Sequence, residues 1–142
     1  MPEVAKRVLV DTNVLIYDIF EDSAYHREAS AILDGAEQWV IPTIVVHELI
    51  WFFRGLGLGL RDALPVITQR ITHEKAVVRP VTLSEITRAL RIIEAEHLAL
   101  SRYNDKLILV VAQNERVPIA TFDAKLRRQA KRLGLEVLPR EL

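Results

Sequence analysis

Four acidic residues fall where apolar segments of the sequence end or where helices begin: Asp11, Glu48, Asp105 and Asp123. Asp11 interrupts the segment VLVDTNVLIY, residues 8–17, between two runs of aliphatic side chains where an unpaired charge is costly to bury. Neighbouring carboxylates raise one another's pKa, so a cluster of them stays ionised only when a cation relieves the repulsion. Carboxylates that share a divalent cation are typical of metal-assisted phosphodiester hydrolysis.

The residue types predict Mg²⁺ or Mn²⁺ as the cation. Carboxylate oxygens are hard ligands, and the chain has no cysteine and no pair of histidines at ligand spacing. His47 and Glu48 resemble the start of a zinc-binding HExxH helix, but Trp51 occupies the place of the second histidine. A zinc site on this helix is therefore excluded.

Each acid also has a structural explanation. Asp11 and Asp123 could cap the helices that follow them, and Asp105 could favour the positive end of a helix dipole. Glu48 has Ile44 and Phe52 as helical neighbours, so it could be a neutralised or Arg-paired core residue. None of these explanations accounts for four acids that converge on one edge of a sheet.

Short apolar segments alternate with helical ones and would position these acids. We expect strands at residues 8–11, 39–42, 76–81, 118–121 and 136–138, and helices at 14–20, 24–34, 44–54, 61–72, 83–97, 105–114 and 124–133. Candidate helix signals are N-caps at Ser23, Thr43 and Asn104, a capping box formed by Thr82 and Glu85, and a C-terminal stop at Gly134.

This alternation predicts one α/β domain over residues 1–142, a three-layer α/β/α sandwich with a central parallel sheet of about five strands. Ligands bind such sheets at the carboxyl ends of the strands, where the four acids are expected to meet. Trp51, Phe52, Phe53 and Leu56 could belong to the core or to a dimer surface, and we predict core for most of them.

The net charge is zero, but acids dominate residues 1–50 and Lys and Arg dominate residues 101–142. Lys125, Arg128 and Arg132 share one side of the last predicted helix and could face a polyanion, the alternative being a solvated helix face. We find no signal segment and no stretch able to span a bilayer, so we expect a soluble cytoplasmic protein.

Four short motifs resemble those of the PIN-domain family of metal-dependent ribonucleases. They are DTN at residues 11–13, Glu48 followed by Leu49, DKLI at 105–108 continuing to Ala112, and TFDAKL at 121–126. The four motifs occur in the same order as in the family, and the resemblance covers Val8 to about Leu138. The length resembles that of the VapC-type toxins of VapBC toxin–antitoxin pairs.

The resemblance implies a catalytic site and its partners. Asp11, Glu48, Asp105 and Asp123 would hold one or two Mg²⁺ or Mn²⁺ ions, and metal-activated water would cleave RNA to leave a 3′-hydroxyl and a 5′-phosphate. Asn13 and Thr121 would orient carboxylates or contact the scissile phosphate, and Lys125, Arg128 and Arg132 would be candidates for contact with the RNA backbone. Similar toxins form homodimers and bind an antitoxin protein.

Three other functions stay open on the sequence. The protein could be a housekeeping RNA-processing PIN nuclease, or a catalytically silent PIN-like binding module. A phosphotransfer domain would also gather acids at strand ends. It is disfavoured because phosphatases of the haloacid dehalogenase type need a DxD motif, and Asn13 stands in place of the second Asp.

Overall fold

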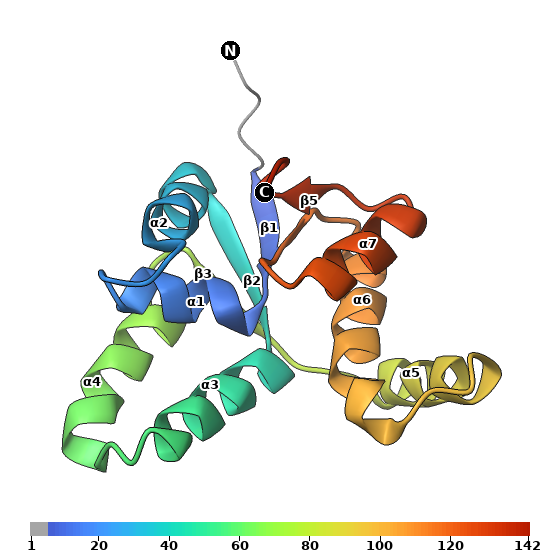
Figure 1. The fold of residues 1–142 in the computed structure, drawn as a ribbon, viewed down its shortest axis with the longest axis horizontal. Coiled ribbons are helices and arrows are strands. Elements are labelled where there is room, and N and C mark those ends of the chain that lie inside the picture. The colour runs from blue at the N-terminus through green and yellow to red at the C-terminus, as the bar shows by residue number, and fades with distance from the viewer. Residues whose placement is uncertain (1–5) are drawn as a thin grey trace.

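The structure is a computed structural model that describes residues 6–142 (Figure 1). Five parallel strands form one sheet in the order β3-β2-β1-β4-β5. The strands are β1 (Arg7–Val10), β2 (Gln38–Pro42), β3 (Ala76–Arg79), β4 (Ile119–Ala120) and β5 (Val137–Leu138). The predicted fold class is confirmed, although the third and fourth strands are shorter than the apolar segments suggested.

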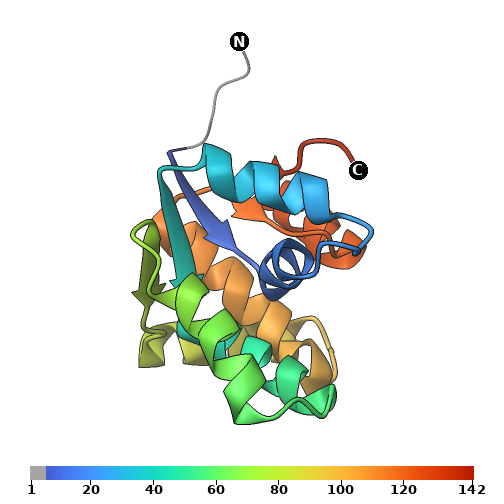
Figure 2. The ribbon, with the colours of Figure 1, turned by 90° about the vertical axis from the view of Figure 1, so that its left-hand side faces the viewer.

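Seven α-helices and one short 3₁₀ helix connect the strands of the described chain. They are α1 (Thr12–Ile19), α2 (His26–Gly35), α3 (Thr43–Gly55), α4 (Leu60–Ile71), α5 (Leu83–Ala95), η1 (Leu100–Arg102), α6 (Tyr103–Glu115) and α7 (Ala124–Arg132). Helices α1 to α4 gather on one side of the sheet and α5 to α7 on the other (Figures 1 and 2). Within residues 6–142, no helix combines the length and apolar composition needed to cross a membrane.

The central strands are buried on both faces, as their unbroken aliphatic sequences predict. Leu9 in β1 pairs with Val40 of β2 on one side and with Ile119 of β4 on the other, and all three side chains are fully buried. In contrast, Val77 and Val78 of the edge strand β3 are partly exposed. The core therefore lies around β1, and the residues that follow β1 are attached to its buried end.

The direction of the crossovers changes between β1 and β4. Strand β1 leads into α1, whereas its neighbour β4 leads into α7 on the opposite side of the sheet (Figure 1). The carboxyl ends of β1 and β4 therefore form a switch point, and open α/β sheets bind ligands in the crevice outside such strand ends.

Three of the predicted helix caps are wrong because tertiary contacts use the side chains differently. Tyr25, not Ser23, is the N-cap of α2, and the Ser23 hydroxyl donates to the carbonyls of residues 17 and 20. Thr43 is the first residue of α3, and its Oγ1 accepts from the Val81 amide. Asn104 lies inside the first turn of α6, and its side chain reaches the acidic site described below.

Other helix signals are confirmed. Thr82 and Glu85 form the reciprocal capping box at the start of α5. Gly134 follows α7 with a φ of 78°, a left-handed conformation that glycine adopts without a steric cost. The sequence predicts that most of the segment from Trp51 to Leu56 belongs to the core. This prediction is correct only in part, because Phe53 is buried whereas Trp51 and Leu56 are about half exposed.

A buried ion-pair network ties the edge of the sheet to the helices. Arg79, the last residue of β3, contacts both carboxylate oxygens of Glu85, at 2.7 Å to Oε2, and reaches Glu115 at the end of α6 at 2.8 Å. Glu85 is only 2% exposed, and its burial opposes ionisation. Hydrogen bonds from Arg79, the Thr82 amide and Asn114 outweigh that effect and lower the Glu85 pKa to about 2.

We expect Glu85→Gln to reduce the free energy of unfolding at pH 7 by about 3 kcal/mol, because it breaks a buried ion pair. The folded pKa of Glu85 lies below its value of 4.5 in the unfolded chain, so the contribution is complete above pH 4.5 and is lost as the pH falls toward 2. Urea denaturation of wild type and variant at pH 7 and pH 3 measures the difference. Glu136→Gln, at an exposed pair with Arg140, is the control. An equal difference at both pH values would contradict the assignment.

Candidate active site

A hydrogen-bonded frame joins the carboxyl ends of β1 and β4. Asp11 follows β1, is 7% exposed and accepts hydrogen bonds from the Thr12 amide at 2.8 Å and from Thr121 Oγ1 at 2.7 Å. Thr121 follows β4 and is completely buried. The hydroxyl of Thr121 also accepts from the Asp123 amide at 3.1 Å. One threonine thus sets the position of Asp11 and of the backbone at Asp123.

Asn13 completes this frame from the first turn of α1. Its Nδ2 lies 3.2 Å from Asp11 Oδ2 and 3.3 Å from Thr121 Oγ1, and its Oδ1 accepts from the Phe122 amide at 3.1 Å. The side chain therefore ties α1 to the segment after β4. The structure brings Asn13 and Thr121 together with Asp11.

Glu48 reaches the same crevice from α3. Its Oε1 accepts from Thr12 Oγ1 at 2.7 Å, and its Oε2 accepts from Asn104 Nδ2 at 3.2 Å. The interpretation of Glu48 as an acid that faces apolar surroundings is corrected, since both oxygens have polar neighbours and the residue is only partly buried. A neutral hydroxyl and an amide hold Glu48 in place without cancelling its charge.

Asp105 lies in the first turn of α6, and the charges of other acids affect its pKa. Its pKa is raised above 3.8 by burial and by the negative charges of Asp123 and Glu48. Arg102 and Lys106 oppose this effect. Asp123 and Glu48 are therefore close enough to Asp105 to disfavour its ionisation.

Asp11 carries the largest perturbation of the four. Burial raises its pKa to about 7, although hydrogen bonds from Thr121 and Thr12 favour the ionised form. The charges of Glu48 and Asp105 raise the pKa further. Every predicted acid thus takes part in one electrostatic cluster, and a perturbed carboxyl group in such a crevice is typical of a functional site.

Two of the structural explanations for these acids also hold. Asp11 is the N-cap of α1 through its bond from Thr12, and Asp123 is the N-cap of α7, where its Oδ1 accepts from the Leu126 amide at 3.0 Å. Capping uses one oxygen of each carboxylate and leaves the mutual repulsion in place. Capping and ligand binding are therefore compatible at both positions.

The donor atoms fit a hard divalent cation. Across residues 6–142, no three His, Asp or Glu side chains converge tightly enough to enclose an ion as they stand. The four carboxylates are nevertheless electrostatically coupled, and those of Asp11 and Asp105 have raised pKa values partly because of their neighbours' charges. A cation would reverse that effect, and oxygen ligands suit Mg²⁺ or Mn²⁺.

Sequence reasoning assigned no role in the site to three residues that support it. Thr12 and Asn104 orient Glu48. Arg127 is buried in α7 and donates to the carbonyls of Thr121 at 2.9 Å and Pro139 at 2.5 Å, which secures the end of β4. The central position of Thr12 in the DTN motif was a usable signal, whereas nothing local distinguishes Asn104 from a helix cap.

The predicted basic residues lie beside the acids rather than among them. Lys125, Arg128 and Arg132 line one cavity on the α7 side, together with Arg102 and Lys106. Arg102 and Lys106 are also the cations that lower the pKa of Asp105. The acidic and basic groups are thus adjacent.

Solved structures with the same fold include several toxins. The chain matches VapC20 of Mycobacterium tuberculosis, described as a sarcin-ricin loop cleaving toxin, with a TM-score of 0.71 and 18% identity over 86% of this chain and 94% of that one. It also matches VapBC2 of Rickettsia felis bound to a promoter DNA fragment, at 0.66 and 15% over 92% and 96%. For FitAcB of Neisseria gonorrhoeae the values are 0.63 and 19% over 95% and 99%.

These likenesses show the fold. No curated protein sequence matches the chain significantly. The sequence model of the PIN domain, however, matches residues 8–132, which include all four acids and the frame around them. The chain therefore belongs to the PIN-domain family.

Proposed function

We propose that the protein is a divalent-metal-dependent endoribonuclease, with Mg²⁺ or Mn²⁺ as cofactor, and the toxin of a toxin–antitoxin pair that acts in the cytoplasm. Membership of the PIN-domain family supports a nuclease. The observation that carries the proposal is the cluster of Asp11, Glu48, Asp105 and Asp123 in the crevice beside β1 and β4, where mutual repulsion calls for a cation.

In this proposal the four carboxylates hold the metal and face the scissile phosphate. These residues would hold the cation, which would supply charge neutralisation at the phosphate and a more acidic bound water. Glu48 belongs to α3 on one side of the sheet, whereas Asp105 belongs to α6 and Asp123 caps α7 on the other side. The phosphate would bind between them, with products that carry a 3′-hydroxyl and a 5′-phosphate.

The neutral residues of the site act as positioning groups. Thr121 and Asn13 hold the Asp11 carboxylate, and Thr12 and Asn104 hold Glu48, each through hydrogen bonds that leave its charge intact. Such supporting hydrogen bonds fix the direction of ligand oxygens, and their loss typically lowers metal affinity or activity by about 10- to 100-fold. Asn13 is also near enough to the crevice to contact the phosphate.

Cations beside the crevice suit an RNA substrate. Lys125, Arg128 and Arg132 lie along one cavity next to Asp105 and Asp123, and their charge favours a polyanion. Single-stranded regions are the expected targets, because their bases and backbone are accessible to side chains. The acids would then cleave a strand that the neighbouring cations hold.

An antitoxin partner is supported by the fold neighbours and by an exposed apolar surface. Solved neighbours include toxin–antitoxin complexes from Rickettsia felis and Klebsiella pneumoniae. On this chain, Trp51, Leu56 and Leu60 are 46%, 51% and 74% exposed along the α3–α4 hairpin. An apolar strip of this kind is typical of a protein interface, so we assign it to the antitoxin or to a homodimer.

The first test is cleavage of end-labelled structured and unstructured RNAs and matching DNAs in Mg²⁺, Mn²⁺ or EDTA. Wild type should cut RNA only with metal. Asp105→Asn should lower the rate by more than about 100-fold, beyond the loss typical of supporting residues. Asp34→Asn, an exposed acid on α2 away from the crevice, should cut at the wild-type rate. Cutting by Asp105→Asn at the wild-type rate, or in EDTA, would exclude the proposed site.

A second test follows metal binding through stability. The Asp11 carboxyl titrates near 3.8 when unfolded and near 7 when folded, so the folded state holds the extra proton between these values. The free energy of unfolding of the metal-free protein should therefore fall as the pH rises from about 4 to about 7. This decline should be smaller in Asp11→Asn, which lacks the carboxyl group at residue 11 but keeps Asp105 with its raised pKa.

At pH 8 the metal should reverse that loss. Mn²⁺ or Mg²⁺ at 100 times its dissociation constant should raise the free energy of unfolding of wild type by about 2.7 kcal/mol, and by much less in Asp11→Asn. Urea denaturation followed by tryptophan fluorescence, with and without EDTA, measures both effects. Equal stabilisation of the two proteins by the metal would show that Asp11 does not bind it.

A further inference from the structure

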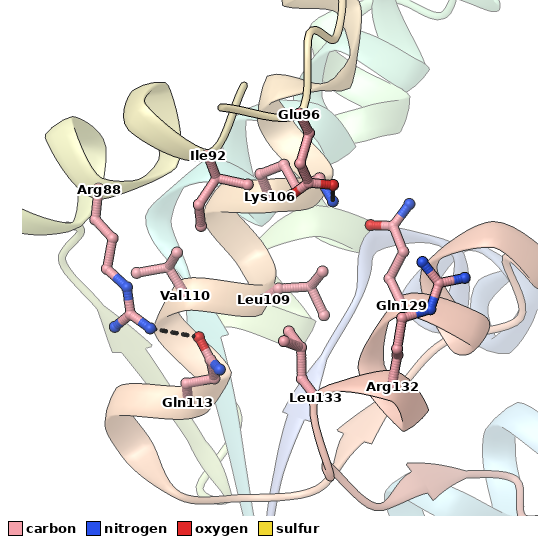
Figure 3. Close-up of a pocket in the computed structure, with 10 residues that line it drawn as sticks. All are labelled: Arg88, Ile92, Glu96, Lys106, Leu109, Val110, Gln113, Gln129, Arg132 and Leu133. Atoms are coloured by element: carbon pink, nitrogen blue, oxygen red, sulfur yellow. Dashed lines mark hydrogen bonds and ion pairs between the residues drawn. The ribbon is translucent and has the colours of Figure 1, made fainter. Parts of the chain in front are cut away.

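Two cavities adjoin in a groove between α5, α6 and α7, and each has a volume of about 320 Å³. The inner cavity, shown in Figure 3, has an apolar wall formed by Ile92, Leu109, Val110 and Leu133. The outer cavity is lined by charged side chains. Because Glu96, Lys106, Gln129 and Arg132 line both cavities, the two form one continuous groove.

The outer part of the groove is strongly cationic. Its walls carry five basic side chains and one acid, and that acid, Glu96, accepts from Lys106 Nζ at 3.1 Å. The other basic residues, Arg102, Lys125, Arg128 and Arg132, form no ion pair with any residue in the range 6–142. Uncompensated positive charge of this density is complementary to successive phosphates.

The inner part offers an apolar surface and one unsatisfied acceptor. Gln129 Oε1 is buried, and no described residue donates a hydrogen bond to it. Figure 3 shows the Gln129 side chain extending from α7 toward Lys106, above the apolar wall. A buried acceptor without a donor is unfavourable. Because Gln129 lines both cavities, a rotation of its side chain would present this acceptor to an N–H group on a ligand in the groove. A flat heterocycle with N–H donors on its edge, such as a nucleobase, meets both requirements.

The groove lies beside the acidic cluster. Lys106 is the neighbour of Asp105 on α6, and Lys125 follows Asp123 by two residues on α7. Arg102 and Lys106 act electrostatically on Asp105. A strand that occupied the groove would therefore place an adjacent phosphate beside the four carboxylates.

We propose that this groove is a nucleotide subsite, in which the inner cavity takes one base of a single-stranded RNA and the outer cavity takes the adjoining phosphates. The inference rests on the proposed ribonuclease function and specifies how the substrate is held. Gln129 and the apolar wall contact the base, and Arg128, Arg132 and Lys125 contact the backbone. A cavity of this volume lies at the small end of ligand pockets and suits one base.

The test measures binding without cleavage. Fluorescence anisotropy in EDTA compares a labelled single-stranded RNA with an oligonucleotide of the same length and backbone that lacks bases. We expect wild type to bind the RNA more tightly than the abasic strand. Gln129→Leu keeps the shape of the side chain and should weaken RNA binding by about fivefold, the contribution of one hydrogen bond. It should leave binding of the abasic strand unchanged.

Two further variants separate the two parts of the groove. Leu133→Ala should weaken binding of the RNA but not of the abasic strand, and Leu83→Ala, an exposed leucine on α5 outside the groove, should weaken neither. Arg128→Gln should weaken both strands and reduce the slope of log affinity against log salt by about 0.7. Arg61→Gln, the same charge change on α4, is its control and should leave that slope as in wild type.

The outcomes distinguish this inference from the proposed function. If wild type cleaves RNA with metal but Gln129→Leu and Leu133→Ala bind RNA as wild type does, the groove is not a base subsite and the nuclease proposal stands. If no RNA is cleaved but the groove variants still lose base-dependent binding, the subsite stands and the nuclease proposal fails. Equal binding of both strands by wild type would overturn the inference directly. Thermal unfolding of each variant verifies that it is folded.

Discussion

Repulsion among carboxylates at the carboxyl ends of β1 and β4 is the constraint on which the rest of the site depends. The crossovers leave these strands toward opposite sides of the sheet, at the kind of switch point where open α/β sheets bind ligands. Neutral donors surround the acids there. Thr12, Asn13, Asn104 and Thr121 fix the directions of Asp11 and Glu48 while leaving the negative charge available to a ligand.

Two groups of buried acids in this fold show opposite electrostatic behaviour. Burial raises the pKa at Glu85 and at Asp11 alike, but Arg79 donates to Glu85 and lowers its pKa to about 2. Asp11 has only neutral donors and acidic neighbours, so its pKa rises to about 7. The first arrangement stabilises the edge of the sheet. The second arrangement leaves Asp11 repelled by neighbouring acids, and a bound cation can relieve that repulsion. This difference distinguishes Glu85, a structural acid, from Asp11, a candidate metal ligand.

The surfaces on the two sides of the acids differ in kind. Helices α3 and α4 present exposed Trp51, Leu56 and Leu60, which suit a protein partner. Helix α7 presents Lys125 and Arg128, and Arg102 of η1 lies beside them, so this side suits RNA. Although the net charge is zero, the molecule has an exposed apolar surface, an acidic centre and a basic groove, and the proposed function assigns a different class of ligand to each.

The sequence by itself determined the alternation of strands and helices, the capping box at Thr82 and the order of the four acids, because these patterns depend on residues close together in the chain. Tertiary structure alone decided that Asn104 holds Glu48 instead of capping its helix, and that none of the described residues donates a hydrogen bond to Gln129 Oε1. Thr121 and Asp11 are 110 residues apart, yet they share a hydrogen bond. Such contacts follow from the strand order of the sheet, which places distant segments side by side, and no local pattern of residues encodes that order.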